Sequence, residues 1–200
     1  MSERFEDNET NKSGAAACTG PASSRTGKNA GAKLIAFAAL AIAWIAFDQL
    51  VKRQIEGVFS VSAAAASEPI VGLFRLHLVY NTGGAWSIFS GSTAALGVFS
   101  LVMCVAIMVY VIVQRRRLSW LEVIGLALVV AGGLGNAIDR FALGHVVDFI
   151  DLTFMDFPVF NIADIGVTCG LVVFLIAWLI RGHREDAAIE NSTADGKAVR

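Results

Sequence analysis

The chain has 200 residues, of which 56% are hydrophobic and 16% are charged, and its formal net charge is −1. This composition is too apolar for an ordinary soluble domain, and the near-neutral charge does not favour nucleic acid as a partner. Cys104 and Cys169 lie within apolar runs, and the sequence has no CxxC motif or Cys/His cluster. Neither a disulfide framework nor a metal site is therefore expected.

The two ends of the chain are polar. Residues 1–32 are rich in Ser, Thr, Asn, Gly, Ala and charged residues and lack apolar periodicity, and residues 182–200 have the same character. Such segments cannot bury enough apolar surface to fold, so both are predicted to be disordered tails. A single domain over 33–181 remains.

Four segments of this domain are apolar enough to cross a membrane. A transmembrane helix takes about 20 residues, with roughly 17 as a lower limit. The third and fourth segments, 123–138 and 165–180, reach that length only if their polar ends extend into the membrane interface. The sequence therefore predicts an all-α membrane protein with four transmembrane helices, at 34–51, 92–113, 123–138 and 165–180.

The connection between the first two helices has a different pattern. In 57–91 the residues Leu73, Arg75 and His77 alternate with Phe74, Leu76 and Leu78, and glycines lie at the edges of the run. A period of two predicts short strands. We therefore expect a small extracytoplasmic β-sheet between helices 1 and 2.

The distribution of Lys and Arg predicts the orientation, because cytoplasmic loops carry an excess of these residues. Near the ends of the apolar segments, one side of the membrane has eight: Arg25, Lys28, Lys33, Arg115, Arg116, Arg117, Arg181 and Arg184. The other side has four: Lys52, Arg53, Arg75 and Arg140. Both termini are therefore expected in the cytoplasm, although Lys52 and Arg53 need a local explanation.

An ionisable residue within a membrane helix is costly, and it suggests function. Asp48 and Lys52 are four residues apart, so their side chains meet on one helix face. The alternative is a surface ion pair that anchors a helix end. In NTGGAW, Asn81 precedes two glycines; it either forms a turn or orients a bound peptide, since its amide both donates and accepts.

The motif GGLGNAIDR at 132–140 ends the third helix. Its glycines let another helix approach closely, and Asn136 and Asp139 share a helix face, followed by Arg140. The alternative is a helix-packing motif with a polar end. A phosphate-binding loop is not expected, because the glycines lie within a helix and no GK[ST] follows.

The stretch GHVVDFIDLTFMDFPVFNIAD at 144–164 contains four aspartates. Asp148 lies in an apolar context, where a spare charge would be unfavourable. Asp151 and Asp156 are expected in a solvated outer loop. Asn161 and Asp164 have the spacing of a capping box, so Asp164 has a capping interpretation besides a functional one.

All of these polar residues map to the same ends of their membrane segments, which favours one polar site near the outer leaflet. No Ser/His, Cys/His or HExxH arrangement accompanies it. Two close carboxyl groups cannot both ionise easily, so they share a proton. The ionised group can accept a proton from water and the protonated one can donate to a carbonyl oxygen, which is aspartyl proteolysis.

Five motifs, in order and spacing, closely resemble the lipoprotein signal peptidase family, also called signal peptidase II: DQLVK, NTGGAW, GGLGNAIDR, GHVVDFID and FNIAD. The resemblance covers about 34–181. It implies a bacterial plasma-membrane aspartyl endopeptidase without a cofactor. Such an enzyme removes the signal peptide from prolipoproteins that carry diacylglycerol, cutting before the lipidated cysteine. Membrane lipids and the inhibitor globomycin are further implied partners.

The resemblance places the catalytic pair on Asp148 and Asp164. It places the supporting polar residues on Asp48, Asn81, Asn136, Asp139, Arg140 and Asn161, and Lys52 joins them through its pairing with Asp48. Gly84 and Trp86 depart from the alanine and phenylalanine that the family often has. A proton- or ion-coupled transporter is the alternative function, but it would more often show internal repeats and broken helices. A membrane scaffold without chemistry is a third possibility.

Overall fold

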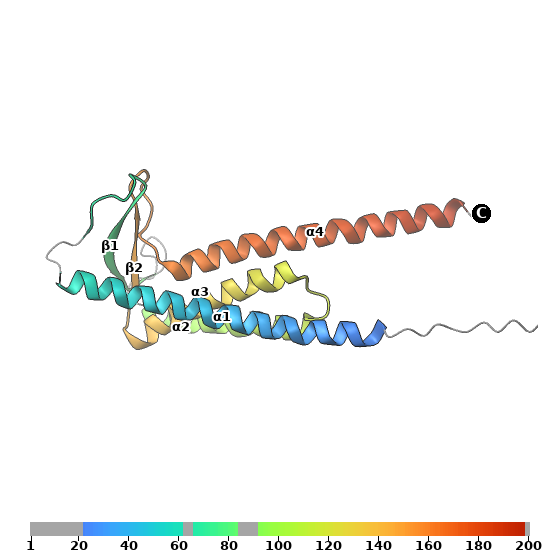
Figure 1. Cartoon of the computed structure of the whole chain (residues 1–200), viewed down its shortest axis with the longest axis horizontal. Coiled ribbons are helices and arrows are strands. Elements are labelled where there is room, and N and C mark those ends of the chain that lie inside the picture. The colour runs from blue at the N-terminus through green and yellow to red at the C-terminus, as the bar shows by residue number, and fades with distance from the viewer. Residues whose placement is uncertain (1–21, 62–65, 84–91, 199–200) are drawn as a thin grey trace, which may run out of the picture.

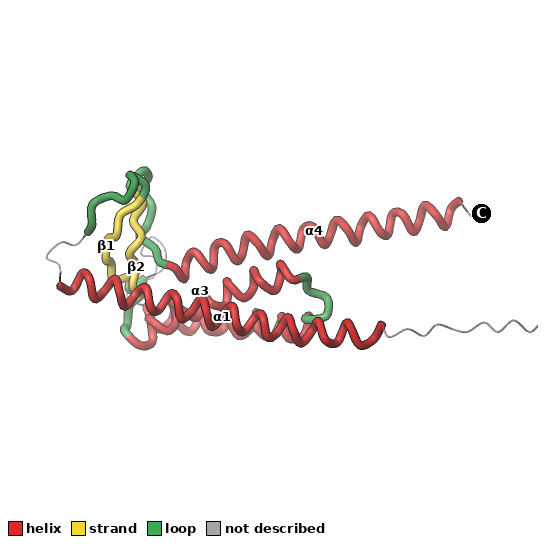
Figure 2. Tube along the Cα trace, viewed as in Figure 1, coloured by secondary structure: helices red, strands yellow, loops and turns green. Residues whose placement is uncertain are grey.

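The structure, a computed structural model, describes residues 22–61, 66–83 and 92–198. Its four helices run along one common direction, and a small sheet lies across one end of the bundle, here called the sheet end (Figures 1 and 2). Each helix contains an apolar stretch of membrane-spanning length, which confirms the predicted multi-pass architecture. The helices are α1 (Ala22–Val61), α2 (Thr93–Gln114), α3 (Trp120–Ala142) and α4 (Ile162–Ala198).

Two helices are longer than the sequence predicts. α1 begins at Ala22, and α4 continues to Ala198, so 22–32 and 182–198 are helical where disordered tails were expected. The expected limits followed hydropathy, which falls where the polar residues begin. Backbone conformation need not change there, since neither helix contains a proline that would interrupt its hydrogen bonds.

α3 is the central helix of the bundle. In its membrane span 56% of residues are buried within the protein, against 17%, 17% and 22% in the other three spans. It begins with a capping box, in which Ser119 and Glu122 each accept a hydrogen bond from the other's backbone N–H. Its apolar face forms the core with α1, α2 and α4, while the outer faces of those helices are left for lipid.

Glycines allow α3 and α4 to approach until their backbones touch. A Cβ on Gly132 would clash with the carbonyl oxygen of Ala163, and one on Gly125 would lie 2.7 Å from that of Gly170. The helix-packing interpretation of the glycine motif is therefore confirmed for Gly132. The contact sets the first turn of α4 beside the part of α3 that carries Asn136.

The predicted sheet is present, but its second strand comes from an unexpected part of the chain. β1 (Phe74–Asn81) pairs antiparallel with β2 (Val146–Leu152), which lies between α3 and α4. The register places Val79 opposite Asp148, and it is interrupted by an irregularity between Leu76 and Val79. Sequence reasoning missed β2 because VVDFIDL has no regular alternation of apolar and polar residues to mark it as a strand.

The close contact at Gly132 gives a test of the packing. Gly132→Ala should destabilise the protein by about 1–3 kcal/mol, because the added methyl group forces α3 and α4 apart. Gly31→Ala is the matched control, since a Cβ there meets no described atom within 4 Å and alanine favours the helix. Thermal unfolding in detergent would compare the two variants. Equal melting temperatures would contradict the packing described here.

Candidate active site

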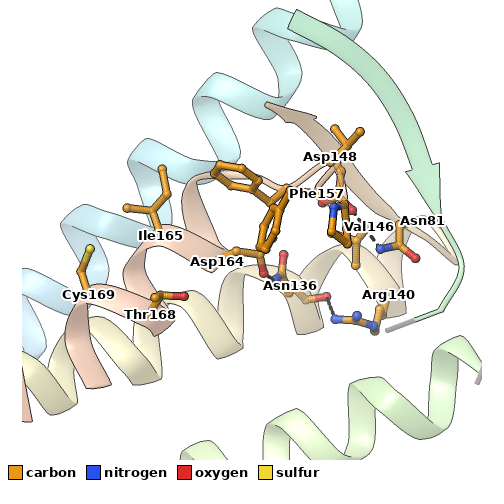
Figure 3. A pocket seen from close by; sticks show the side chains of 13 residues that line it. Asn81, Asn136, Arg140, Val146, Asp148, Phe157, Asp164, Ile165, Thr168 and Cys169 are labelled. Carbon is orange, nitrogen blue, oxygen red and sulfur yellow. Dashed lines mark hydrogen bonds between the residues drawn. The ribbon is translucent and has the colours of Figure 1, made fainter. Parts of the chain in front are cut away.

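A pocket of about 430 Å³ lies at the sheet end, between α3, α4 and β2. Figure 3 shows Asp148, on β2, and Asp164, on the first turn of α4, both in its wall. Asn81, Asn136 and Arg140 line it from β1 and α3. The structure thus brings together five polar residues from four of the five sequence motifs.

Asp148 is buried on β2 and held by two amides. Its Oδ2 accepts a hydrogen bond of 2.9 Å from Asn81 Nδ2, and its Oδ1 accepts one of 2.6 Å from Asn161 Nδ2. Burial raises the pKa of Asp148 to about 7; the hydrogen bonds from the two amides oppose that rise, and the charge of Asp164 adds to it. Near neutral pH this carboxyl group is therefore present in both forms.

Asp164 has two roles, one for each carboxyl oxygen. Its Oδ2 accepts from the backbone N–H of Asn161 at 3.1 Å, while Asn161 Oδ1 accepts from the backbone N–H of Asp164 at 3.0 Å. This is the reciprocal cap that the spacing indicated. Its Oδ1 accepts from Asn136 Nδ2 at 2.8 Å. The capping and the pocket interpretations are thus compatible.

Asn161 connects the two carboxyl groups. Besides capping α4 with its oxygen, it directs its Nδ2 towards Asp148 and towards Asn136 Oδ1, at 3.0 Å. The side chain is fully buried, so its position is set by these contacts. Two carboxyl groups in one pocket, each receiving amide hydrogen bonds, form an arrangement that suits general acid–base chemistry.

A buried ion cluster supports the pocket from behind. Lys52 Nζ lies 2.9 Å from Asp48 Oδ2, 2.7 Å from Asp139 Oδ2 and 3.1 Å from Asn136 Oδ1. Asp48 Oδ1 accepts from the backbone N–H of Ala163 at 2.9 Å. Lys52 and Asp48 are buried, so the surface ion-pair interpretation is wrong. The cluster joins α1 to α3 and to the start of α4.

Gln49 also belongs to this cluster, and it is not among the residues predicted from the sequence. Its Nε2 donates to Asp139 Oδ1 at 2.7 Å and to the carbonyl oxygen of Gly135 at 3.3 Å. A signal was available, because Gln49 precedes Lys52 by three residues and so lies on the same helix face.

Arg140 lies between the pocket and the chain that follows β1. Its Nη1 donates to the carbonyl oxygen of Asn136 at 3.3 Å, and its Nη2 donates to that of Gly83 at 3.2 Å. It therefore fixes the end of β1 against α3. Gly84 and Trp86, which follow directly, lie outside the described residues.

The other two aspartates of the 144–164 stretch lie away from the pocket lining. Asp151 is on β2 and not in a loop as expected, and its Oδ2 lies 2.7 Å from Arg75 Nε and 3.3 Å from His77 Nδ1. Asp156 is exposed in the loop after β2. Over 22–61, 66–83 and 92–198, no group of three His, Cys, Asp or Glu residues could hold a metal ion.

Residues 40–180 match the family "Signal peptidase (SPase) II". The chain belongs to this family. Among curated relatives, the lipoprotein signal peptidase of Gloeobacter violaceus is 42% identical, covering 74% of this chain and 83% of its own. That of Lactiplantibacillus plantarum is 38% identical, covering 70% and 91%.

The fold is also similar to solved structures. A bacterial membrane enzyme solved by the in meso method at 2.3 Å resolution has a TM-score of 0.63 and 32% identity, covering 72% of this chain and 87% of its own. A second, at 1.9 Å, has a TM-score of 0.61 and 31% identity. The protein is thus a membrane peptidase of the aspartyl type, and nothing in these relationships supports the transporter alternative.

The ion cluster predicts a large effect of removing its cation. Lys52→Met should destabilise the protein by about 3–5 kcal/mol, because Asp48 and Asp139 would remain buried without a counter-charge. Arg75→Gln is the comparison, since it breaks an exposed ion pair worth roughly 0–1 kcal/mol. Unfolding in detergent would measure both. A Lys52 variant as stable as the Arg75 variant would show that the cluster does not support the fold.

The raised pKa of Asp148 predicts a pH-dependent stability. Between its ordinary pKa of 3.8 and about 7, the folded state binds a proton that the unfolded state has lost, so stability falls as pH rises through this range. Between pH 5 and pH 8 the loss due to Asp148 should be on the order of 3 kcal/mol. Asp148→Asn should therefore lose less stability than the wild type over this interval. An identical loss in both proteins would contradict the assignment.

Proposed function

We propose that this peptidase removes the signal peptide from prolipoproteins that already carry diacylglycerol on a cysteine, and that it cuts just before that cysteine. The proposal is supported by the names of the relatives and by one observation above all: two buried carboxyl groups line a single pocket at the end of a membrane bundle. Asp148 and Asp164 are the proposed catalytic pair.

In this mechanism the two carboxyl groups share one proton. The ionised group removes a proton from a water molecule, whose oxygen attacks the carbonyl carbon of the scissile peptide bond. The protonated group donates its proton to the carbonyl oxygen. As the tetrahedral intermediate collapses, the first group gives its proton to the leaving nitrogen and the second group takes a proton back from a hydroxyl of the intermediate, which restores the starting protonation state. A carboxyl pKa near 7, as for Asp148, suits a group that must both take and give a proton.

The position of the pocket suits a substrate held in the bilayer. The lining continues from Asp164 along α4 to Ile165, Thr168 and Cys169, and the last two are exposed on the membrane span. A precursor anchored by its acyl chains could move sideways along this face until its cleavage point reaches the acids. The membrane then supplies much of the orientation that a soluble enzyme obtains from a deep cleft.

We further propose that both termini lie in the cytoplasm of a bacterium and that the pocket lies near the outer leaflet of its plasma membrane. The excess of Lys and Arg at the opposite end supports this orientation. Of the four cations at the sheet end, Lys52 is neutralised within the ion cluster and Arg75 is paired with Asp151. Residues 33–181 are the proposed catalytic domain, and globomycin-type inhibitors and membrane lipids are its proposed ligands.

The decisive test is cleavage of a lipidated precursor by purified variants. Asp148→Asn and Asp164→Asn should each reduce the rate by at least roughly 10²–10⁴-fold, because each removes one acid–base group and leaves an amide of similar shape. Asp151→Asn and Asp156→Asn are matched controls from the same segment, outside the pocket lining, and should retain most activity. Products would be separated on a gel, with melting temperatures recorded for every variant.

Two results would overturn the assignment. Normal turnover by a folded Asp148 or Asp164 variant would mean that the carboxyl pair is not catalytic. Loss of activity in the Asp151 or Asp156 variant alone would mean that the wrong pair had been selected. Globomycin should inhibit the wild type and both control variants alike.

A further inference from the structure

The two-stranded sheet projects sideways from the bundle. In Figure 1, β1 and β2 lie across the direction of the helices at the sheet end, and the turns that precede β1 and follow β2 lie away from the bundle. β1 has eight residues, so it extends by ~25 Å. Because the helices cross the bilayer, a sheet at a steep angle to them lies along the membrane surface.

The two faces of this sheet differ in polarity. The cross-strand pairs Phe74–Leu152 and Leu76–Ile150 lie on one face, because residues two apart in a strand point the same way. The pair Arg75–Asp151 lies on the other face and forms an ion pair. A sheet with one apolar and one charged face suits a boundary between lipid and water.

The far end of the sheet is apolar and exposed. Val71 is 87% exposed and Phe154 is 64% exposed. They belong to a group of exposed apolar side chains, here called the sheet tip: Ile70, Val71, Leu73, Phe154 and Met155. A contiguous exposed apolar group of this kind marks an interaction surface.

The backbone at the sheet tip is strained at Val71. Val71 has a φ of 55°, a left-handed conformation that costs a residue with a Cβ about 1–2 kcal/mol and that glycine would adopt freely. The turn is nevertheless fixed, because the backbone N–H of Thr153 donates to Leu73 O at 3.0 Å and its hydroxyl donates to Gly72 O at 2.8 Å. A strained, exposed valine contributes little to the fold itself.

We propose that the sheet tip is a membrane anchor, which inserts Val71 and Phe154 into the boundary between headgroups and acyl chains of the leaflet at the sheet end. The four membrane spans set the level of that boundary, and the sideways projection of the sheet keeps the tip near it. β2 ends at the tip and also carries Asp148, so the anchor restrains the strand that bears one of the two acids. The proposal does not depend on the identity of the substrate.

Spin labelling of the full chain in lipid nanodiscs would test this directly. Cys18, Cys104 and Cys169 are first replaced by serine or alanine, and single cysteines are then introduced as Val71→Cys and Phe154→Cys. Glu68→Cys is the matched control, because Glu68 is exposed close to the tip but is polar. Val102→Cys, on the exposed face of α2, supplies the lipid-embedded reference. The discs contain phosphatidylethanolamine and phosphatidylglycerol.

Each label is then exposed to oxygen, which concentrates in lipid, and to a water-soluble nickel chelate. Labels at 71 and 154 should be several-fold less accessible to nickel than the label at 68, and should approach the oxygen accessibility of the label at 102. If nickel reaches 71 and 154 as readily as 68, the tip lies in water or against another protein, and the proposal is wrong. Should Phe154→Cys fail to fold, Val71→Cys decides the question, and neither result depends on catalysis.

Discussion

The ammonium group of Lys52 is the constraint on which the rest of the site depends. A cation removed from water must be surrounded by acceptors, and here the acceptors come from Asp48 on α1 and from Asp139 and Asn136 on α3. These two helices can therefore not slide or rotate relative to each other without exposing a buried charge. Asp48 extends the constraint to α4, because its second oxygen accepts from the backbone N–H of Ala163.

The same cation determines which atoms face the two acids. Lysine can only donate, so Asn136 presents its oxygen to Lys52 and its Nδ2 to Asp164. Asn161 is oriented in a similar way, since its oxygen accepts from the first turn of α4 and its Nδ2 is left for Asp148. Both acids thus receive N–H groups whose direction is fixed by contacts deeper in the protein. The N–H groups of Asn136 and Asn161 therefore contribute to the polarity of the pocket, as the two acids do.

Sequence reasoning found the four helices and the polar residues of the site because both leave local signals, namely long apolar runs and charges that interrupt them. It could not find β2, because VVDFIDL has no regular alternation of apolar and polar residues, and its first four residues are buried on both faces. It also placed Asp151 in solvent, since its partner Arg75 is 76 residues away and only the strand register brings the two together.

Helix limits were missed for a related reason. Hydropathy reports where lipid ends, whereas a helix ends where its backbone hydrogen bonds are broken. The predicted apolar segments begin at 34 and end at 180, but α1 begins at Ala22 and α4 ends at Ala198. Gln49 was missed for a different reason. Its spacing from Lys52 places it on the same helix face, but an uncharged side chain is not unusual near the end of a membrane helix. Local patterns thus identified the participants, and only the tertiary arrangement showed how they are joined.

The double duty of Asp164 affects how variants at this position should be interpreted. An alanine there would remove the acid and also the acceptor that closes the first turn of α4, so a dead enzyme would not reveal which loss was responsible. An amide retains an oxygen for the backbone N–H of Asn161 but has no ionisable carboxyl proton. At Asp164 the capping role and the acid–base role can therefore be separated only by an isosteric replacement, because alanine removes both.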